Sequence, residues 1–135
     1  MKILQPPDWV APRGYSNGIA ARGTVVALGG LIGWNAECKF EHHDFVGQAG
    51  QTLRNILAVL AEAGGRPEHI VRMTWYMTDK KQYLEAGRPL GKIYRELMLG
   101  ADGKTHYPAM AAVQVAALME DEALVEIEAT AVIPD

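Results

Sequence analysis

The sequence has very little cysteine: Cys38 is the only one among 135 residues. A single thiol excludes an intramolecular disulfide framework and any zinc site built from several cysteines. Cys38 also has no predicted helix N-terminus beside it to activate it, so an inert thiol is a better interpretation than a nucleophile. This cysteine usage fits a reducing compartment, and we expect a cytoplasmic protein.

The sequence also lacks a basic stripe and a long apolar run. The formal net charge is −3, with lysine and arginine scattered along the chain, whereas nucleic-acid backbones attract clustered positive charge. No window approaches the ~18 apolar residues of a membrane span, and the N-terminus has no apolar core of signal-peptide length. We therefore expect an unprocessed, soluble protein that has neither membranes nor nucleic acids as partners.

What remains is the composition of an ordinary globular protein, with 49% hydrophobic and 21% charged residues. We expect a single domain over residues 1–135, preceded by an extended, proline-bearing arm over residues 1–13. A chain this short leaves much of its surface outside its own core, so a symmetric partner is expected to complete any site.

Two helices are predicted. Asp44 stands at the N-cap position of a helix with apolar residues at helical spacing, which ends at Gly64, where glycine allows a left-handed cap. Residues 80–99 return to helical spacing, but Gly87 and Pro89 predict that this second helix is broken or begins late.

Strands are predicted on both sides of the first helix. Residues 15–30 carry two short apolar runs around Gly23, which predicts a β-hairpin. Residues 31–43 are expected to form a further short strand and a loop. Residues 69–79 alternate with strong β-formers, and their place after a strand and a helix indicates parallel pairing.

The chain closes with two predicted strands, 109–118 and 123–133, joined by an acidic turn. In the last strand Glu126 and Glu128 share one face, about 7 Å apart. The mixed order of elements indicates an α+β fold with both helices on one face of a mixed sheet. On a monomer the glutamates would be solvent-exposed, whereas under a neighbouring subunit a carboxylate there could hold a water or accept its proton.

Other polar residues carry weaker signals. His42 and His43 have no third ligand at a metal-binding spacing, so we predict a solvated loop pair and no metal site. His106 could act as an acid or base, although no partner for it can be identified. The glycines of residues 29–33 do not match a phosphate loop, but their amides could hydrogen-bond a carbonyl or a carboxylate.

Four segments in order resemble the Rid family of reactive-intermediate deaminases, also called the YjgF or L-PSP endoribonuclease family. They are RGYSNGI, GQTLRNILAVLAEAGG, HIVRMTWYMTD and YPAMAAVQVAALMEDEALVEIEATAV, and the match extends from Pro12 to Val132. The resemblance implies a chorismate-mutase-like α+β fold and a homotrimer whose sheets form a central barrel. It also implies ligand clefts between subunits.

For function, the resemblance implies hydrolysis of small reactive enamines or imines to a carbonyl product and ammonia, with no metal or organic cofactor. It matches Tyr15 to the family's cleft tyrosine and Glu126 to the glutamate that positions water, so these two residues are the predicted catalytic ones. Gly30, followed by Leu31, matches the family's backbone contact with the ligand.

The sequence departs from the archetype on the predicted strand after Pro108. Met110 stands where the archetypal deaminase carries an arginine, and Ala112 where it often carries a cysteine. A guanidinium grips a carboxylate with two charge-assisted hydrogen bonds, which a thioether cannot do. Either another cation replaces it, with Arg88, Lys92 and Arg13 as candidates, or the cleft is apolar and its ligand lacks a carboxylate there.

The resulting prediction is a cofactor-independent deaminase that hydrolyses a C–N bond of a small-molecule substrate. The alternative is a non-catalytic small-molecule-binding or regulatory trimer with the same fold. Glu126 favours the enzyme, and Met110 favours the alternative. The ribonuclease activity implied by the family's older name has no basic groove, histidine pair or metal site to support it.

Overall fold

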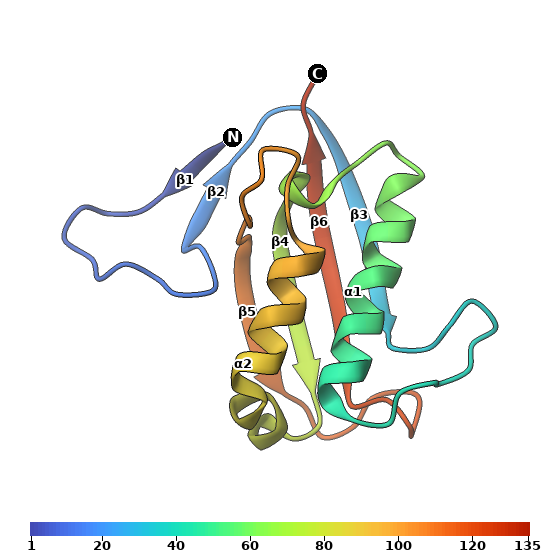
Figure 1. The fold of residues 1–135 in the computed structure, drawn as a ribbon. Coiled ribbons are helices and arrows are strands. Elements are labelled where there is room, and N and C mark those ends of the chain that lie inside the picture. Colours follow the sequence, from blue (N-terminus) through green and yellow to red (C-terminus); the bar gives the residue numbers. More distant parts are fainter.

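The computed structural model describes all 135 residues and places two helices on one face of a four-stranded sheet (Figure 1). The strands lie in the order β3 (Thr24–Ile32), β6 (Val125–Ile133), β4 (Ile70–Met77) and β5 (Ala109–Gln114). Strand β6 runs antiparallel to both of its neighbours, whereas β4 and β5 are parallel. This is the mixed sheet of the predicted α+β fold.

Helix α1 (Phe45–Ala61) forms where the capping residue Asp44 and the glycine stop at Gly64 predicted it. The Asp44 side chain accepts a hydrogen bond from the Gly47 amide at 3.1 Å, which satisfies one of the free amides of the first turn. Beyond the helix, Gly64 takes a φ of +76°, a left-handed conformation that suits glycine. The buried stripe that faces the sheet consists of Ala49, Leu53, Ile56 and Leu60.

Helix α2 (Lys80–Leu97) is broken, as predicted. Gly87 interrupts it with φ 47° and ψ −127°, two residues before Pro89. Proline at the start of a new helical segment costs no hydrogen bond, because the first amides of a helix have no partner in it. The second half of α2 passes over β4 and β5 (Figure 1) and buries Tyr94 against them.

The last strand confirms the predicted alternation. Its residues Val125, Ile127, Ala129 and Ala131 are buried in the core beneath the helices. Glu126 and Glu128 point to the opposite face, which no helix covers. We refer to this uncovered side of the sheet as the open face.

The predicted hairpin over residues 15–30 is wrong. Strand β2 (Gly18–Ala20) pairs with β1 (Lys2–Leu4) in a separate two-stranded sheet, and β3 pairs with β6 instead. Gly23 lies beside the paired end of β6, where a Cβ would collide with the Ile133 carbonyl oxygen. Glycine is therefore required there because two backbone segments approach each other closely, and not because the backbone makes a tight turn.

Two strand boundaries also differ from the predictions. Residues 31–43 contain no strand of their own, because Leu31 and Ile32 complete β3 and the rest is a loop. Strand β5 ends at Gln114 rather than at residue 118. Its partner in the sheet, β4, ends at Met77, which pairs with Gln114, so the later residues have no ladder to extend.

Strands β3 and β4 run in the same direction, as predicted, but they do not pair with each other, because β6 lies between them. The parallel pair in direct contact is β4 with β5, which α2 connects. The N-terminal arm, expected to be extended and irregular, contains the paired segment β1.

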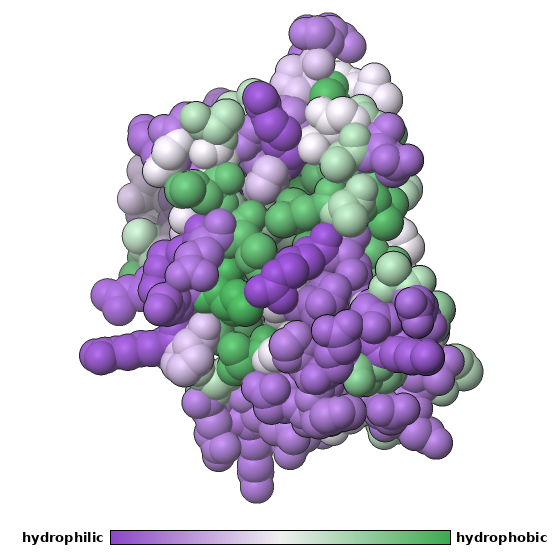
Figure 2. Space-filling view, turned by 45° about the vertical axis from the view of Figure 1, so that its right-hand side comes forward, coloured by the Kyte–Doolittle hydropathy of each residue, from purple (hydrophilic) through white to green (hydrophobic).

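The surface is chemically mixed. In the view that brings the side of α1 forward, hydrophobic surface runs through the middle and hydrophilic surface surrounds it (Figure 2). On the open face, Val25 and Val113 are exposed. No helix combines the length and the apolarity that crossing a membrane requires.

Candidate functional site

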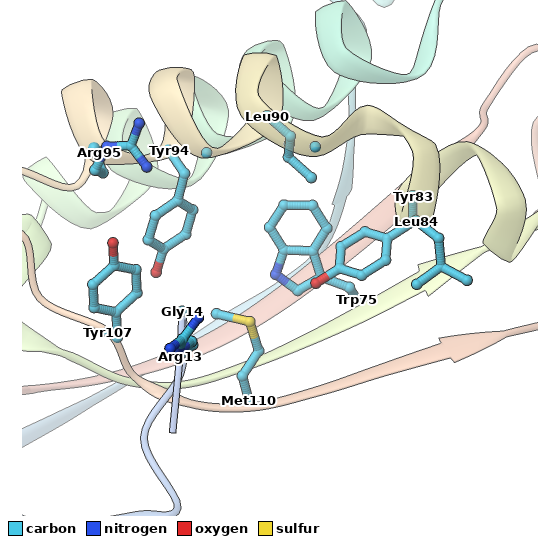
Figure 3. Close-up of a pocket in the computed structure, with 12 residues that line it drawn as sticks. Arg13, Gly14, Trp75, Tyr83, Leu84, Leu90, Tyr94, Arg95, Tyr107 and Met110 are labelled. Carbon is cyan, nitrogen blue, oxygen red and sulfur yellow. The ribbon is translucent and has the colours of Figure 1, made fainter. Parts of the chain in front are cut away.

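A cavity of about 430 Å³ lies between α2 and the strands β4 and β5 (Figure 3). Its walls are largely aromatic and aliphatic, with two guanidinium groups among them. The lining side chains used below are Arg13, Trp75, Tyr83, Leu90, Tyr94, Arg95, Tyr107 and Met110.

Met110 forms part of the floor of this cavity. It pairs with the buried Met73 in the parallel ladder, so its side chain points to the helix side of the sheet and into the cavity (Figure 3). A second hollow of about 240 Å³ adjoins the first and shares several of its residues. It is lined by Arg13, Gly14, Tyr15, Tyr83, Met110 and Ala112. The structure thus brings together Tyr15, Met110 and Ala112.

The N-terminal segment reaches this place because it is fastened along the free edge of β5. The Ser16 amide donates to the Pro108 carbonyl at 3.0 Å, and the Ser16 hydroxyl donates to the Tyr107 carbonyl at 2.6 Å. Ser16 is buried, and Gly14 turns the chain with a φ of +76°. These contacts place Arg13 and Tyr15 beside Met110.

Glu126 and Gly30 form a second group. The β3–β6 register shifts between Leu28 and Leu31, which leaves Gly29 and Gly30 in an irregular stretch. A Cβ built on Gly30 would lie 2.6 Å from Glu126 Oε2. The glutamate side chain therefore lies directly on the glycine, in space that any larger residue would fill.

The two groups lie on opposite faces of the sheet. Glu126 pairs with Tyr76 and points to the open face, whereas Met110 points to the helix side. Leu31 also turns towards the helix side, where it packs against the core. Within one chain, Glu126 lies beside the predicted ligand contact Gly30, but the thickness of the sheet separates it from the predicted contacts Met110 and Ala112.

The structure distinguishes among the candidate replacement cations. Arg88 and Lys92 are exposed on α2 and line neither hollow. Arg13 lines both hollows beside Met110, and Arg95, which the sequence analysis did not select, lines the larger one. Arg95 gave no signal in the sequence because a charge near a helix end usually faces solvent.

The larger cavity contains two polar atoms that have no hydrogen-bond partner, the Trp75 indole Nε1 and the Tyr94 hydroxyl. The two residues are 2% and 6% exposed. The ring of Tyr94 stacks on that of Tyr107, with centroids 5.4 Å apart and an interplanar angle of 9°. Burial raises the pKa of Tyr94 far above that of free tyrosine, so its hydroxyl stays protonated and can donate.

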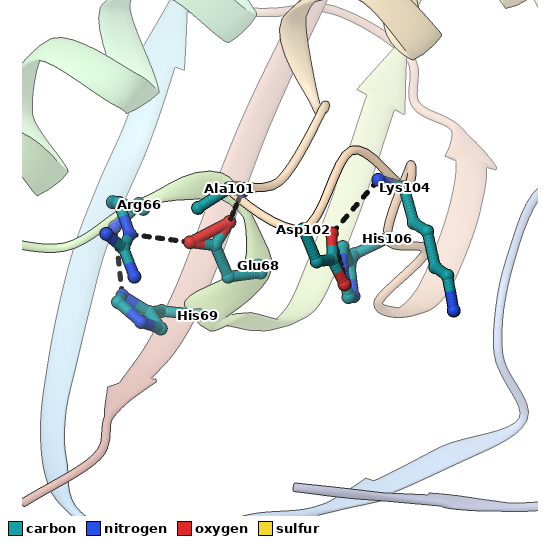
Figure 4. A network of polar contacts seen from close by, with 7 residues as sticks. All are labelled: Arg66, Glu68, His69, Ala101, Asp102, Lys104 and His106. Carbon is teal, nitrogen blue, oxygen red and sulfur yellow. Dashed lines mark hydrogen bonds and ion pairs between the residues drawn. The ribbon is translucent and has the colours of Figure 1, made fainter.

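His106 has a partner after all, in a network of polar contacts (Figure 4). Its Nε2 lies 2.9 Å from Asp102 Oδ2, and the Lys104 amide donates to Asp102 Oδ1 at 3.0 Å. These bonds, the Lys104 amide first and then His106, lower the pKa of Asp102. Neither residue lines the hollow beside Met110, so the pair organises its own loop.

Glu68 joins the same loop to the short helix η1 (Pro67–His69). It accepts hydrogen bonds from the Ala101 amide at 2.9 Å and from Arg66 Nε at 2.6 Å (Figure 4). Burial by itself would raise the pKa of Glu68, but the bonds from the amides and from Arg66 together lower it below its usual 4.5.

We predict that Glu68→Gln lowers the Tm at neutral pH, because the amide forms weaker bonds with these donors than the carboxylate does. Because the pKa of Glu68 is lowered in the folded state, its ionised carboxylate stabilises the fold fully above pH 4.5. This stabilisation is lost as the pH falls through the lowered pKa. The difference in Tm between the parent and Glu68→Gln should therefore disappear as the pH is lowered. Melting curves between neutral and acidic pH, with the exposed Glu62→Gln as control, test this, and a pH-independent gap would contradict it.

Comparisons with known proteins show the family to which the chain belongs. The family model described as endoribonuclease L-PSP matches residues 8–133. A RutC family protein of Aquifex aeolicus is 35% identical over 133 residues, covering 98% of this chain and 99% of that protein.

Solved structures share the fold. A Rid family protein of unknown function from Yersinia pestis superposes with a TM-score of 0.78 at 24% identity, covering 98% of both chains. RidA from an Antarctic Psychrobacter superposes with a TM-score of 0.66 at 30% identity, covering 98% of this chain and all of that one. Since the family model and these relatives span nearly the whole chain, the protein belongs to the Rid family, whose family model is that of endoribonuclease L-PSP.

Proposed function

We propose that this protein hydrolyses a small reactive enamine or imine to a carbonyl product and ammonia. The observation that carries the proposal is the placement of Glu126 directly on Gly30 at the open face. A carboxylate and an accessible backbone amide side by side can hold a water and a polar substrate atom in one place. Membership of the Rid family, whose archetypal members are deaminases, supports this reading.

In the proposed reaction an enamine first takes a proton on its β-carbon and loses one from its nitrogen, which gives the imine. A water held by Glu126 then adds to the imine carbon, while Glu126 accepts a proton from that water and the nitrogen takes one up. The carbinolamine collapses to the carbonyl product as the C–N bond breaks and ammonia leaves. An activated C=N bond needs little acceleration, so a sparse site with Tyr15 orienting the ligand is chemically sufficient.

A second copy of the chain is part of the proposal. Glu126 and Gly30 lie on the open face and Tyr15, Met110 and Ala112 on the other side, so one chain cannot present both groups to one small ligand. The open face has no helix over it and exposes apolar side chains. We propose a homotrimer in which the open faces meet and a cleft between subunits combines the two groups.

The alternative is a trimer that binds a small molecule without turning it over. It is favoured by Met110, because β5 carries no cation at the position where the archetypal deaminase has its arginine. In this alternative the hollow beside Met110 is retained as a binding site and Glu126 performs no chemistry.

Ammonia release from freshly generated imines and enamines, 2-aminoacrylate included, tests the proposal directly. We expect turnover above the uncatalysed rate for at least one substrate, together with a trimer by light scattering. A monomer in solution would remove the structural basis of the composite cleft. A trimer with no turnover, which gains 2-aminoacrylate turnover only as Met110→Arg, would establish the binding alternative.

A further inference from the structure

A separate cavity of about 440 Å³ lies where the small sheet of β1 and β2 meets the end of β6, and we refer to it as the β1 cavity. Lys2 pairs with Ala20 across the small sheet, and both residues line the cavity. Arg22 lines it from the segment before β3, and His69 lines it from η1. The fold thus brings together cationic and hydrogen-bonding side chains from three segments that are remote in the sequence. The other lining residues are Met1, Ala21, Glu68, Val132 and Pro134.

The β1 cavity carries positive charge that the chain does not neutralise. Neither Lys2 nor Arg22 forms an ion pair. Glu68 is the one acidic residue among those that line the cavity, and both of its oxygens have partners. Arg66 Nε donates to Oε1 at 2.6 Å, and the Ala101 amide donates to Oε2 at 2.9 Å (Figure 4). Since Arg66 already balances the charge of Glu68, two cations remain without an ion-pair partner.

His69 adds a hydrogen-bond donor whose tautomer follows from its surroundings. Its Nδ1 lies 3.0 Å from the Arg66 amide nitrogen (Figure 4). A backbone amide can only donate, so Nδ1 is the acceptor of this bond. The neutral ring therefore carries its hydrogen on Nε2, which leaves Nε2–H as a donor.

This set of groups determines the kind of ligand. Two cations and one donor, supplied by three segments, match an anion that has acceptor oxygens on several sides. A phosphate monoester has three terminal oxygens and a charge of about −1.5 to −2 at pH 7, and both lysine and arginine bind phosphate. A carboxylate carries a single charge and only two oxygens, which lie in one plane. Phosphate is therefore the better match.

The rest of the cavity determines what the phosphate is attached to. The volume of about 440 Å³ falls within the roughly 300–1,000 Å³ of small-molecule sites and exceeds what a phosphate group fills by itself. The surface beside the cations is uncharged and largely apolar, and it consists of Ala20, Ala21, Val132 and Pro134. A small, uncharged organic body fits this surface.

We propose that the β1 cavity binds a small phosphate monoester, whose phosphate group contacts Lys2, Arg22 and His69 and whose organic body lies against the apolar surface. None of the lining residues belongs to the proposed deaminase site. The inference therefore goes beyond the proposed function and does not depend on it. It assigns to the chain a second small-molecule site of different chemistry.

Calorimetric titration with phenyl phosphate, in phosphate-free buffer of constant ionic strength, tests the inference. Benzenesulfonate is the matched probe, because it has the same ring and three oxygens but a single negative charge. We expect one phenyl phosphate per chain and an affinity for benzenesulfonate lower by about tenfold or more, since the charge-assisted contacts are weaker. Inorganic phosphate should bind severalfold more weakly than phenyl phosphate, and equal affinity would reject the organic body.

Substitutions of the two cations locate the site. Arg22→Gln should weaken phenyl phosphate binding by about tenfold or more, and Lys2→Gln should weaken it severalfold. Both side chains belong to exposed residues, so the Tm of each variant should stay close to that of the parent. Arg54→Gln, which removes the same charge from an exposed position on α1, should bind phenyl phosphate like the parent.

His69→Asn separates a binding role from a structural one. The asparagine oxygen can accept the bond from the Arg66 amide as Nδ1 does, but the shorter side chain places no donor where Nε2–H lies. We expect a Tm close to that of the parent and severalfold weaker binding of phenyl phosphate. A purely structural His69 would give a lower Tm and unchanged affinity. Parent-like binding by Arg22→Gln, or equal binding of phenyl phosphate and benzenesulfonate, would overturn the inference.

Discussion

Glu126→Gln is expected to lower kcat/KM for the best imine substrate by about 10²- to 10⁴-fold, the contribution typical of a positioned general base. The amide can still hydrogen-bond a water, but it cannot accept the proton that the water loses during attack. Since glutamine has nearly the same size and shape, the contact of the side chain with Gly30 should be preserved. The measurement is ammonia release under saturating and subsaturating substrate.

Glu128→Gln is the matched control for this variant. It lies two residues away on the same strand and the same open face, where it accepts a hydrogen bond from the Tyr76 hydroxyl at 2.7 Å. We expect it to retain turnover close to that of the parent. Equal losses of kcat/KM in both variants would mean that the reaction needs the negative charge of the open face and not a base at Glu126. Full activity of Glu126→Gln would reject the role assigned to Glu126.

Gly30→Ala is expected to lower turnover by about 10²-fold, the effect of displacing a catalytic group by roughly 1 Å. The added Cβ would lie 2.6 Å from Glu126 Oε2 and 2.9 Å from its Cδ, closer than van der Waals contact permits. The obstructed atoms are the end of a flexible side chain, which can swing away at little cost to the fold. Activity should therefore fall while the Tm stays close to that of the parent.

Gly29→Ala is the control for this substitution, because a Cβ on the preceding residue would meet no atom within 4 Å. It makes the same backbone change one residue earlier in the same irregular stretch and should retain parent-like turnover. Thermal melts of both variants accompany the ammonia assay. Parent-like turnover in Gly30→Ala would show that the reaction does not need Glu126 in its observed position.

The elements that could be predicted from the sequence are those that short-range physics specifies. Helix α1 has its cap at Asp44, an apolar stripe and a glycine stop within one continuous segment. The break in α2 was readable from Gly87 and Pro89. The alternation of β6 assigned Glu126 and Glu128 to one face before any partner strand was known. In each case the decisive residues are only a few positions apart.

Strand partners were decided by the tertiary structure. The apolar runs around Gly23 looked like the two arms of a hairpin, yet β3 pairs with β6, about a hundred residues later in the chain. A β-strand can pair with any edge of suitable register, so its own sequence does not name its partner. Gly23 then serves a contact with Ile133 that no local pattern encodes.

In the candidate site, too, some features follow from the sequence and others only from the tertiary structure. By itself the sequence determined which residue types are present, including the glutamate at position 126 and the methionine at position 110. Only the tertiary structure decided that these two residues face opposite sides of the sheet, and that Arg13, rather than Arg88 or Lys92, lies beside Met110. The physical reason is that a side chain's direction follows from local backbone geometry, whereas its neighbours are selected by packing between segments remote in the chain.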